Sequence, residues 1–224
     1  MAVFDANDDV ADRSEVRRRV PSLPALVALL LACMFLAAAV TYRWDHRRAD
    51  FGAVDVGFFD DMITHHLQAI DLATVYTRYG TDDLFRGDAS KIIFNQSGDI
   101  RQMRLALRDW NRSGSPDVAM EWMGMRSAQD AQPGMATPRQ LAALREARGR
   151  RIDDLFSALM INHHAGGIHM ADYAATHAKT KVARTLARAM ARDQRFEIVD
   201  LNGRRAQLGL PPHQPGVPVA IPGA

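Results

Sequence analysis

Hydrophobic and polar residues follow one another along this chain with the spacing of helices. Apolar positions recur every three to four residues over four segments, roughly 52–79, 84–111, 138–177 and 180–208. No segment keeps a strict alternation with a period of two, so strand signals are scarce. Gly80 and the Asp82–Asp83 pair supply a C-terminal stop and an N-cap between the first two segments. The pattern predicts an all-α protein.

The N-terminal part of the chain has a different pattern. Residues 23–42 carry no charge, and about 20 helical residues cross a hydrocarbon core of about 30 Å. Arginines lie on both sides of this stretch, so the positive-inside bias is weak. We expect a cytoplasmic tail over 1–22 and a single-pass signal anchor over 23–43. The rest of the chain would then lie outside the cytoplasm, held to the cell membrane by this helix.

Two other interpretations of the N-terminal segment stay open. A signal peptide could be removed, although no small-residue cleavage site followed by a polar region stands out. Leu30-Leu31-Ala32-Cys33 resembles a lipobox, although apolar residues continue well past Cys33. Otherwise Cys33 is a lipid-facing residue of the anchor. As the only cysteine, it excludes an intramolecular disulfide and a four-cysteine zinc site.

The main body of the chain contains an internal repeat. Placing residue 55 on residue 153 without gaps gives eight identities in nineteen positions, including the His65-His66 and His163-His164 pairs. The same offset continues downstream, where Gln96 meets Gln194. We therefore expect two tandem helical hairpins, at 52–111 and 138–208, that fold together as a four-helix bundle.

The structure of the segments outside the repeats is predicted from their amino-acid composition. Residues 112–137 contain turn formers and have the composition of a linker, with methionines at Met120, Met123, Met125 and Met135. Residues 209–224 hold five of the ten prolines and are expected to be extended or disordered.

Each repeat carries one copy of the motif Met-Ile-x-His-His. On a helical wheel, His65 and His66 fall on either side of Met62, on the apolar face of the first helix. Two polar rings on a buried face need partners, because an unsatisfied buried polar group costs about 1–3 kcal/mol. They could be core histidines bonded to carboxylates or carbonyls. Their recurrence in both repeats favours a role in metal binding instead.

Thioether and imidazole ligands together suit Cu(I) better than Mg, Ca or Mn. The main candidate metal ligands are Met62, His65, His66, Met160, His163 and His164. His169 is a weaker candidate, because the wheel places it opposite Met160 on the outer face. The other weaker candidates are methionines of the helices and linker, namely Met103, Met120, Met123, Met125 and Met170.

Composition and motifs argue against other functions. The formal net charge is +2 and no basic stripe stands out, so nucleic-acid binding is not expected. The chain has no Glu-x-x-His of a di-iron bundle and no His-Glu-x-x-His of a zinc peptidase. No nucleophile motif or phosphate-binding glycine loop is found, so an enzyme is not expected.

The segments FFDDMITHHLQAIDLA and LFSALMINHHAGGIHMA resemble the signature of domain-of-unknown-function family 305, which includes CopM-like copper-tolerance proteins. The resemblance covers about residues 52–208. It implies a ferritin-like four-helix bundle and binding of copper or silver in the cell envelope, through the Met and His residues of the two motifs. Asp71 stands where the second copy has His169, so the copies need not bind equally.

The leading hypothesis is therefore a membrane-anchored, extracytoplasmic protein that binds Cu(I), or Ag(I), for buffering or tolerance. The alternatives are a structural or partner-binding bundle without metal, and an oxidant scavenger that uses its methionines. The sequence leaves open whether the chain self-associates or meets a copper-handling partner in the envelope.

Overall fold

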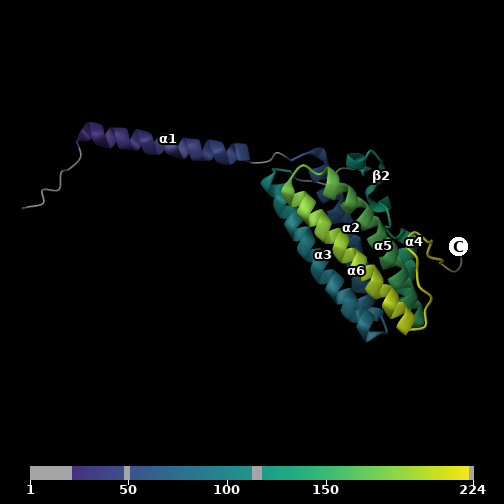
Figure 1. Ribbon diagram of the computed structural model, residues 1–224. Helices are drawn as coiled ribbons and strands as arrows, with labels where there is room; N and C mark the ends of the chain where they lie inside the picture. The colour runs from purple at the N-terminus through teal and green to yellow at the C-terminus, as the bar shows by residue number, and fades with distance from the viewer. Residues whose placement is uncertain (1–21, 48–50, 113–117, 222–224) are drawn as a thin grey trace, which may run out of the picture. The chain divides into compact units, whose positions relative to one another are not determined.

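The computed structural model describes residues 22–47, 51–112 and 118–221, and its two compact units, 1–47 and 48–224, are considered separately. Six α-helices lie within the described residues (Figure 1). They are α1 (Leu23–Arg47), α2 (Ala53–Tyr79), α3 (Asp83–Asp109), α4 (Pro138–Glu146), α5 (Arg150–His177) and α6 (Lys181–Gln207).

Helix α1 forms the first unit and is long and apolar enough to cross a membrane. Its apolar part runs over Leu23–Thr41, and none of it is buried inside the protein. The large side chains of this stretch, such as Leu30 and Phe35, are exposed. A helix with these properties near an N-terminus is a signal sequence or an anchor.

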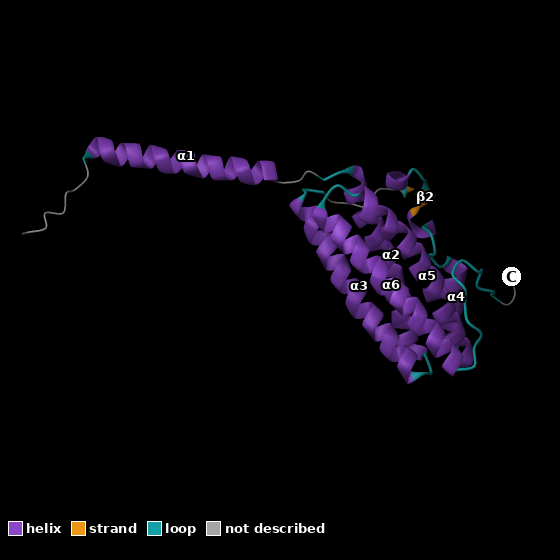
Figure 2. Ribbon diagram, viewed as in Figure 1, coloured by secondary structure: helices purple, strands orange, loops and turns teal. Residues whose placement is uncertain are grey.

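The second unit is a bundle of the four long helices α2, α3, α5 and α6 (Figures 1 and 2). Each repeat folds as a helical hairpin, with α3 packed on α2 and α6 packed on α5. Helices α2 and α5 also pack on each other, whereas α3 and α6 pack less closely. The prediction of four long helices in two hairpins is confirmed, with Asp82 as the N-cap of α3.

Two aspartates that coincide in the repeat hold the hairpins together. Asp55 of α2 accepts hydrogen bonds from Thr180, in the loop between α5 and α6. Asp153 of α5 accepts hydrogen bonds from Thr81, in the loop between α2 and α3. Burial raises the pKa of the Asp55 carboxyl, but its hydrogen bonds, chiefly from Thr180, outweigh burial and lower it. Each hairpin loop is thus closed by a carboxylate of the other repeat.

The expected single helix over 138–177 is wrong, because two helices occupy that range. Helix α4 ends at Glu146, and α5 begins at Arg150 after Gly149, which adopts a positive φ of 58°. Few residues other than glycine adopt this left-handed conformation, and the helical period on either side hid the break. Pro138 at the start of α4 and the Thr137 N-cap mark a true helix start.

The linker is structured within its described residues, 118–137. It contains two short antiparallel strands, β1 (Val118–Ala119) and β2 (Ser127–Ala128), and two 3₁₀ turns, η1 (Glu121–Met123) and η2 (Gln129–Ala131). Strands of two residues are too short to show an alternating pattern. Asp61 of α2 anchors this segment, accepting hydrogen bonds from the backbone of Met120 and the indole of Trp122. A segment with the composition of a linker therefore contributes to the core.

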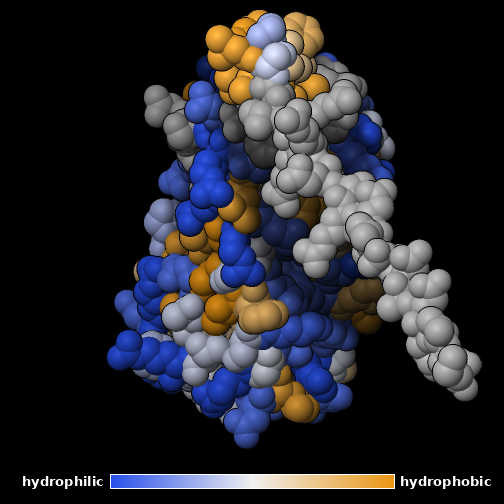
Figure 3. All heavy atoms as spheres, turned by 90° about the vertical axis from the view of Figure 1, so that its left-hand side faces the viewer, coloured by the Kyte–Doolittle hydropathy of each residue, from blue (hydrophilic) through white to orange (hydrophobic). Residues whose placement is uncertain are grey.

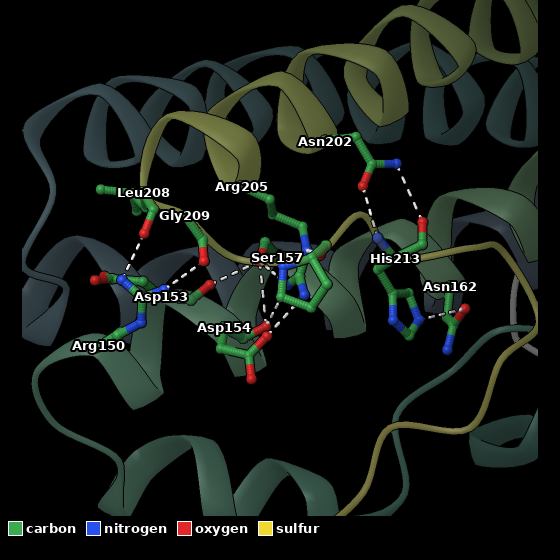
Figure 4. A network of polar contacts seen from close by, with 11 residues as sticks. Arg150, Asp153, Asp154, Ser157, Asn162, Asn202, Arg205, Leu208, Gly209 and His213 are labelled. Carbon is green, nitrogen blue, oxygen red and sulfur yellow. Dashed lines mark hydrogen bonds and ion pairs between the residues drawn. The ribbon is translucent and has the colours of Figure 1, made fainter.

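The C-terminal segment after α6 is extended, as expected, and it is tied to the bundle over its described residues. Figure 4 shows the polar contacts that hold its first part. Arg205 donates to the Pro211 carbonyl and pairs with Asp154. Asn162, the variable residue of the second motif, contacts His213 and donates to the Val217 carbonyl. Helix contacts, rather than helical propensity, order this proline-rich segment.

Two adjacent glycines allow close packing against the middle of α5, and the helix continues through both. A Cβ on Gly166 would overlap the carbonyl oxygen of Pro133 in the linker. A Cβ on Gly167 would overlap the side-chain oxygen of Gln194 on α6. Gly167 therefore allows the close approach of α6, and Gly166 allows that of the linker.

Replacing Gly166 with alanine is expected to destabilise the bundle by about 2–3 kcal/mol, because the overlapping atom belongs to the backbone. The matched control is Gly87→Ala on α3, where no atom lies within 4 Å of the added Cβ. The control should stabilise the chain by about 0.5–1 kcal/mol, since glycine is unfavourable inside a helix. Thermal unfolding followed by circular dichroism measures both changes. Equal shifts in Tm would contradict the close packing at Gly166.

Candidate metal centre

The four motif histidines lie at the centre of the bundle. His65 and His66 come from α2, His163 and His164 come from α5, and all four side chains have an exposed fraction of 0%. The rings of His65 and His163 face each other with centroids 3.8 Å apart. The expected burial of both pairs, and their meeting in one core, are therefore confirmed by the geometry.

The contacts of His65 and His163 fix where their ring protons lie. His65 Nε2 is 3.1 Å from the Pro133 carbonyl oxygen, and His163 Nε2 is 3.0 Å from the His65 carbonyl oxygen. A carbonyl oxygen only accepts, so each Nε2 carries the proton and donates it. In a neutral ring the other nitrogen, Nδ1, is then a bare lone pair.

His66 and His164 have carboxylate partners at equivalent places in the two repeats. His66 Nε2 lies 3.4 Å from Asp99 on α3, and His164 Nε2 lies 2.8 Å from Glu197 on α6. Each of these ring nitrogens therefore has a carboxylate beside it, and the His164–Glu197 contact is the shorter of the two. A carboxylate beside one ring nitrogen favours a proton on that nitrogen and again leaves Nδ1 bare. Burial raises the pKa of Glu197, but His164 outweighs it and the pKa is lowered.

The Nδ1 atoms of all four histidines are buried and have no hydrogen-bond partner. Buried polar atoms are normally satisfied, and each exception needs a reason. Metal-binding histidines commonly donate one ring N–H to a carbonyl or carboxylate and bind the ion with the other nitrogen. The four rings match this pattern, so the donor set fits a soft metal ion.

The four buried histidines form the histidine core, in which His65 and His163 stay neutral over the physiological pH range. Burial, and next the neighbouring His66, lower the pKa of His65 to about 3. Burial, and next the adjacent His65 ring, lower the pKa of His163 well below its usual value. Neutral imidazole is the form that binds metal, so the site needs little proton release to accept an ion.

Side chains of His, Cys, Asp and Glu alone do not complete a metal centre here. Among the described residues, no group of three or more of them is arranged to hold an ion. Any centre built on the histidines must therefore include other donors, such as thioethers, or involve movement of the rings.

The methionines lie in two separate parts of the core, on either side of the histidines. Met62, Met103, Met120, Met170 and Met190 pack in one hydrophobic cluster, which we call the methionine-rich half. Met160 packs in the other cluster. Along α2 and α5, the two clusters are separated by the histidine pairs. The predicted ligands Met62 and Met160 are both fully buried, but they are not brought together.

The repeat supplies an internal comparison for these methionines. The position of Met103 corresponds to Leu201, that of Met170 to Leu72, and that of Met190 to Ile92. The Leu72, Ile92 and Leu201 side chains fill the other cluster. An apolar side chain of similar size therefore satisfies the packing, and the thioethers are concentrated in one half only.

The remaining candidates are placed differently. His169 is exposed on α5, as the wheel predicted, and lies outside the histidine core. Met123 is half-buried and Met125 has an exposed fraction of 40%, so neither belongs to the buried cluster. Met120, also from the linker, is almost fully buried.

Sequence reasoning did not include the polar residues of α3 and α6 that lie level with the histidines. These are Gln96, Asp99, Gln194 and Glu197, which occupy equivalent positions in the two repeats. Along both helices they lie between the two hydrophobic clusters. The match of Gln96 with Gln194, and of the carboxylates Asp99 and Glu197, was visible in the sequence and could have found them. With the histidines they form one polar layer across the bundle.

Four antiparallel helices around a buried histidine layer define the chain as a helical bundle with a candidate metal centre. Residues 55–204 match the family model of the domain of unknown function DUF305, and the chain belongs to this family. None of the curated proteins matches it.

Solved structures of the same family resemble the bundle. A DUF305 protein from Streptomyces coelicolor, described as secreted, is 31% identical over 72% of this chain and 97% of its own, with a TM-score of 0.67. A DUF305 fragment from Deinococcus radiodurans is 28% identical over 71% and 99%, with a TM-score of 0.62. CopM in its Cu(I)-bound form is 24% identical over 69% and 96%, with a TM-score of 0.56, and is similar in fold.

Proposed function

We propose that this protein binds Cu(I), or Ag(I), in its histidine core and methionine-rich half, and serves copper buffering or tolerance. The observation that carries the proposal is the set of four buried Nδ1 atoms without partners, whose Nε2 atoms each face an acceptor. Such a set offers lone pairs to an ion that the rest of the protein leaves unused. No catalytic step is part of the proposal.

The choice of metal follows from the donors. Neutral imidazole and thioether are soft or intermediate ligands, which favour Cu(I) over Mg, Ca or Mn. The related CopM has been solved with Cu(I) and with Cu(II) bound, which supports copper as the ion to test first. The predicted ligands closest to this arrangement are the four histidines with Met62. The structure adds Met190 to Met103 and Met170 as further thioethers of the same half.

The proposal places the bundle outside the cytoplasm, anchored by α1. Its apolar stretch is uncovered by the rest of the protein, which a core helix would not be. The short N-terminal tail and large C-terminal unit suit an anchor with its N-terminus inside. A protease-protection assay on intact cells tests this orientation.

Titration of the full-length chain in detergent with Cu(I), against a competing chelator, tests the proposed function. The informative variant carries Met103→Leu, Met170→Leu and Met190→Ile, the residues of the other repeat. Because Leu and Met have similar volumes, the bundle should stay folded while Cu(I) affinity falls about tenfold or more. Met125→Leu, an exposed linker change, is the matched control and should leave affinity unchanged. If the triple variant binds Cu(I) as tightly as the wild type, Met103, Met170 and Met190 are not ligands of the site.

Two other functions make different predictions. A structural bundle, favoured by the hydrogen bonds from His65 and His163 to carbonyls, predicts that copper never raises Tm. An oxidant scavenger, favoured by the exposed Met125, predicts sulfoxide there under oxidant with no dependence on metal. Metal analysis of the purified chain separates both from the copper proposal.

A further inference from the structure

A cleft opens between α3 and α6 on one side of the polar layer. Its volume is about 230 Å³, and its lining includes Gln96 and Asp99 from α3 and Met190, Gln194 and Glu197 from α6. The two helices pack less closely on each other than α2 does on α3 or on α5, which leaves this space. The cleft therefore reaches the level of the histidines from the side opposite α2 and α5.

Two glutamines of the cleft are buried and leave polar side-chain atoms unpaired. Gln96 and Gln194 each have an exposed fraction of 3%. Both side-chain atoms of Gln96 and the side-chain oxygen of Gln194 lack hydrogen-bond partners. Gly167 of α5 leaves room for the Gln194 oxygen at this position. Glutamine occurs at this position in both repeats, so each repeat places a buried amide with an unpaired oxygen at the cleft. A polar ligand in the cleft would satisfy these oxygens.

The charge of the cleft indicates the sign of that ligand. Three carboxylates, Asp99, Asp193 and Glu197, line it against one guanidinium, that of Arg101. Amide oxygens and carboxylates are hard donors, suited to a cation that retains part of its water. The carboxylates are too dispersed to hold an ion by themselves, so the amides are needed to complete the set.

The cleft and the histidine core share two side chains. Glu197 lines the cleft and lies 2.8 Å from His164, while Asp99 lines it and lies 3.4 Å from His66. An ion in the cleft is therefore separated from the imidazoles by a single layer of side chains. Met190, which belongs to the methionine-rich half, also borders the cleft.

Apolar side chains gather in a band between hydrophilic ones on the face shown in Figure 3. On α3 and α6, Phe94 and Phe196 are exposed, and Phe94 borders the cleft. The hydrophilic walls of the cleft thus adjoin apolar surface.

We propose that the α3–α6 cleft is a second cation site, in which Gln96, Gln194, Asp99 and Glu197 hold a partly hydrated ion through oxygen. It is the antechamber from which copper passes to the histidines. The antechamber role rests on the proposed function, whereas the cation site itself does not.

Mn(II) is the probe for this site, because it prefers oxygen ligands and water over thioethers. Its binding to the full-length chain in detergent is followed by electron paramagnetic resonance. Gln96→Leu with Gln194→Leu removes the amides at similar volume and should weaken Mn(II) binding about tenfold or more. Gln102→Leu, an exposed glutamine that also lines the cleft, is the matched control and should change little.

Cu(I) measurements on the same variants separate the two proposals. The double leucine variant should keep its equilibrium Cu(I) affinity within about twofold but take up Cu(I) about tenfold more slowly. Unchanged Mn(II) binding in this variant overturns the cation site, and unchanged uptake overturns the antechamber role. If the leucine pair misfolds, Gly167→Ala displaces Gln194 instead and should weaken Mn(II) binding. Loss of the proposed copper function alone would leave Mn(II) binding intact.

Discussion

Replacing His65, His66, His163 and His164 together with glutamine is expected to lower Cu(I) affinity at least a thousandfold. The glutamine amide nitrogen reaches about as far as Nε2, so it can still donate to the partners of the histidines. What disappears is the Nδ1 lone pair at each position. Structural Zn²⁺ sites in small peptides are worth about 10–16 kcal/mol at neutral pH. Losing several ligands from a site of that order removes most of the affinity.

The matched control is His169→Gln, which makes the same chemical change on the exposed face of α5. It should leave Cu(I) affinity unchanged. Copper should raise the Tm of the wild-type chain and of this control but not that of the fourfold variant, because only a bound ligand stabilises the folded state. A folded fourfold variant with wild-type Cu(I) affinity would rule out the proposed metal centre.

The metal-free bundle is expected to lose stability as pH falls below about 6.5. The folded-state pKa of His65 is about 3 and that of His163 is also depressed, whereas unfolded histidine titrates near pH 6.5. The unfolded chain therefore binds more protons between these values. The stability contributed by the two neutral rings is complete above about pH 6.5 and is lost as pH falls through this window. Each additional proton bound by the unfolded chain adds about 1.4 kcal/mol per pH unit to the slope of the free energy of unfolding against pH.

Two carboxyls, Asp60 and Asp88, oppose this trend, because burial raises the pKa of each. Asp60 has the larger shift and must be removed for a clear measurement. Burial, and next the neighbouring Asp61, raise the pKa of Asp60 to about 6, so Asp60 favours the folded state as pH falls. In an Asp60→Asn background, the two histidines should lower the free energy of unfolding by about 3–4 kcal/mol as the pH falls from 7 to 5. Chemical unfolding of the full-length chain at a series of pH values measures this. Adding His65→Gln and His163→Gln should flatten the curve, and an equally steep curve would contradict neutral histidines.

The repeat and the helical period were enough to predict the bundle, because both depend on local spacing. They predicted the burial of both histidine pairs and the exposure of His169 correctly. They did not predict the break at Gly149, because apolar spacing continues across it and the turn depends on a single positive φ. The ordered linker was missed because its order comes from Asp61, far away in sequence.

The candidate site was only partly predictable for a similar reason. Helical wheels place residues on a face but do not say how far along the bundle two faces meet. Met62 and Met160 occupy the same repeat position, yet the antiparallel arrangement of α2 and α5 sends them to opposite sides of the histidines. The same arrangement brings Met62 together with Met170 and Met190, which occupy positions that hold Leu72 and Ile92 in the first repeat.

The reciprocal contacts of Asp55 and Asp153 have a consequence for how such a chain can arise and fold. In a lone hairpin, the aspartate near the start of the first helix would have no loop threonine to donate to it. The threonine of the hairpin's own loop would likewise have no carboxylate to donate to. Its apolar face would also remain open to water. A chain with one repeat could satisfy both needs only by pairing with an identical copy about a two-fold axis. In the duplicated chain the two hairpins make this pairing within one molecule, so it corresponds to a dimer whose two subunits are covalently linked.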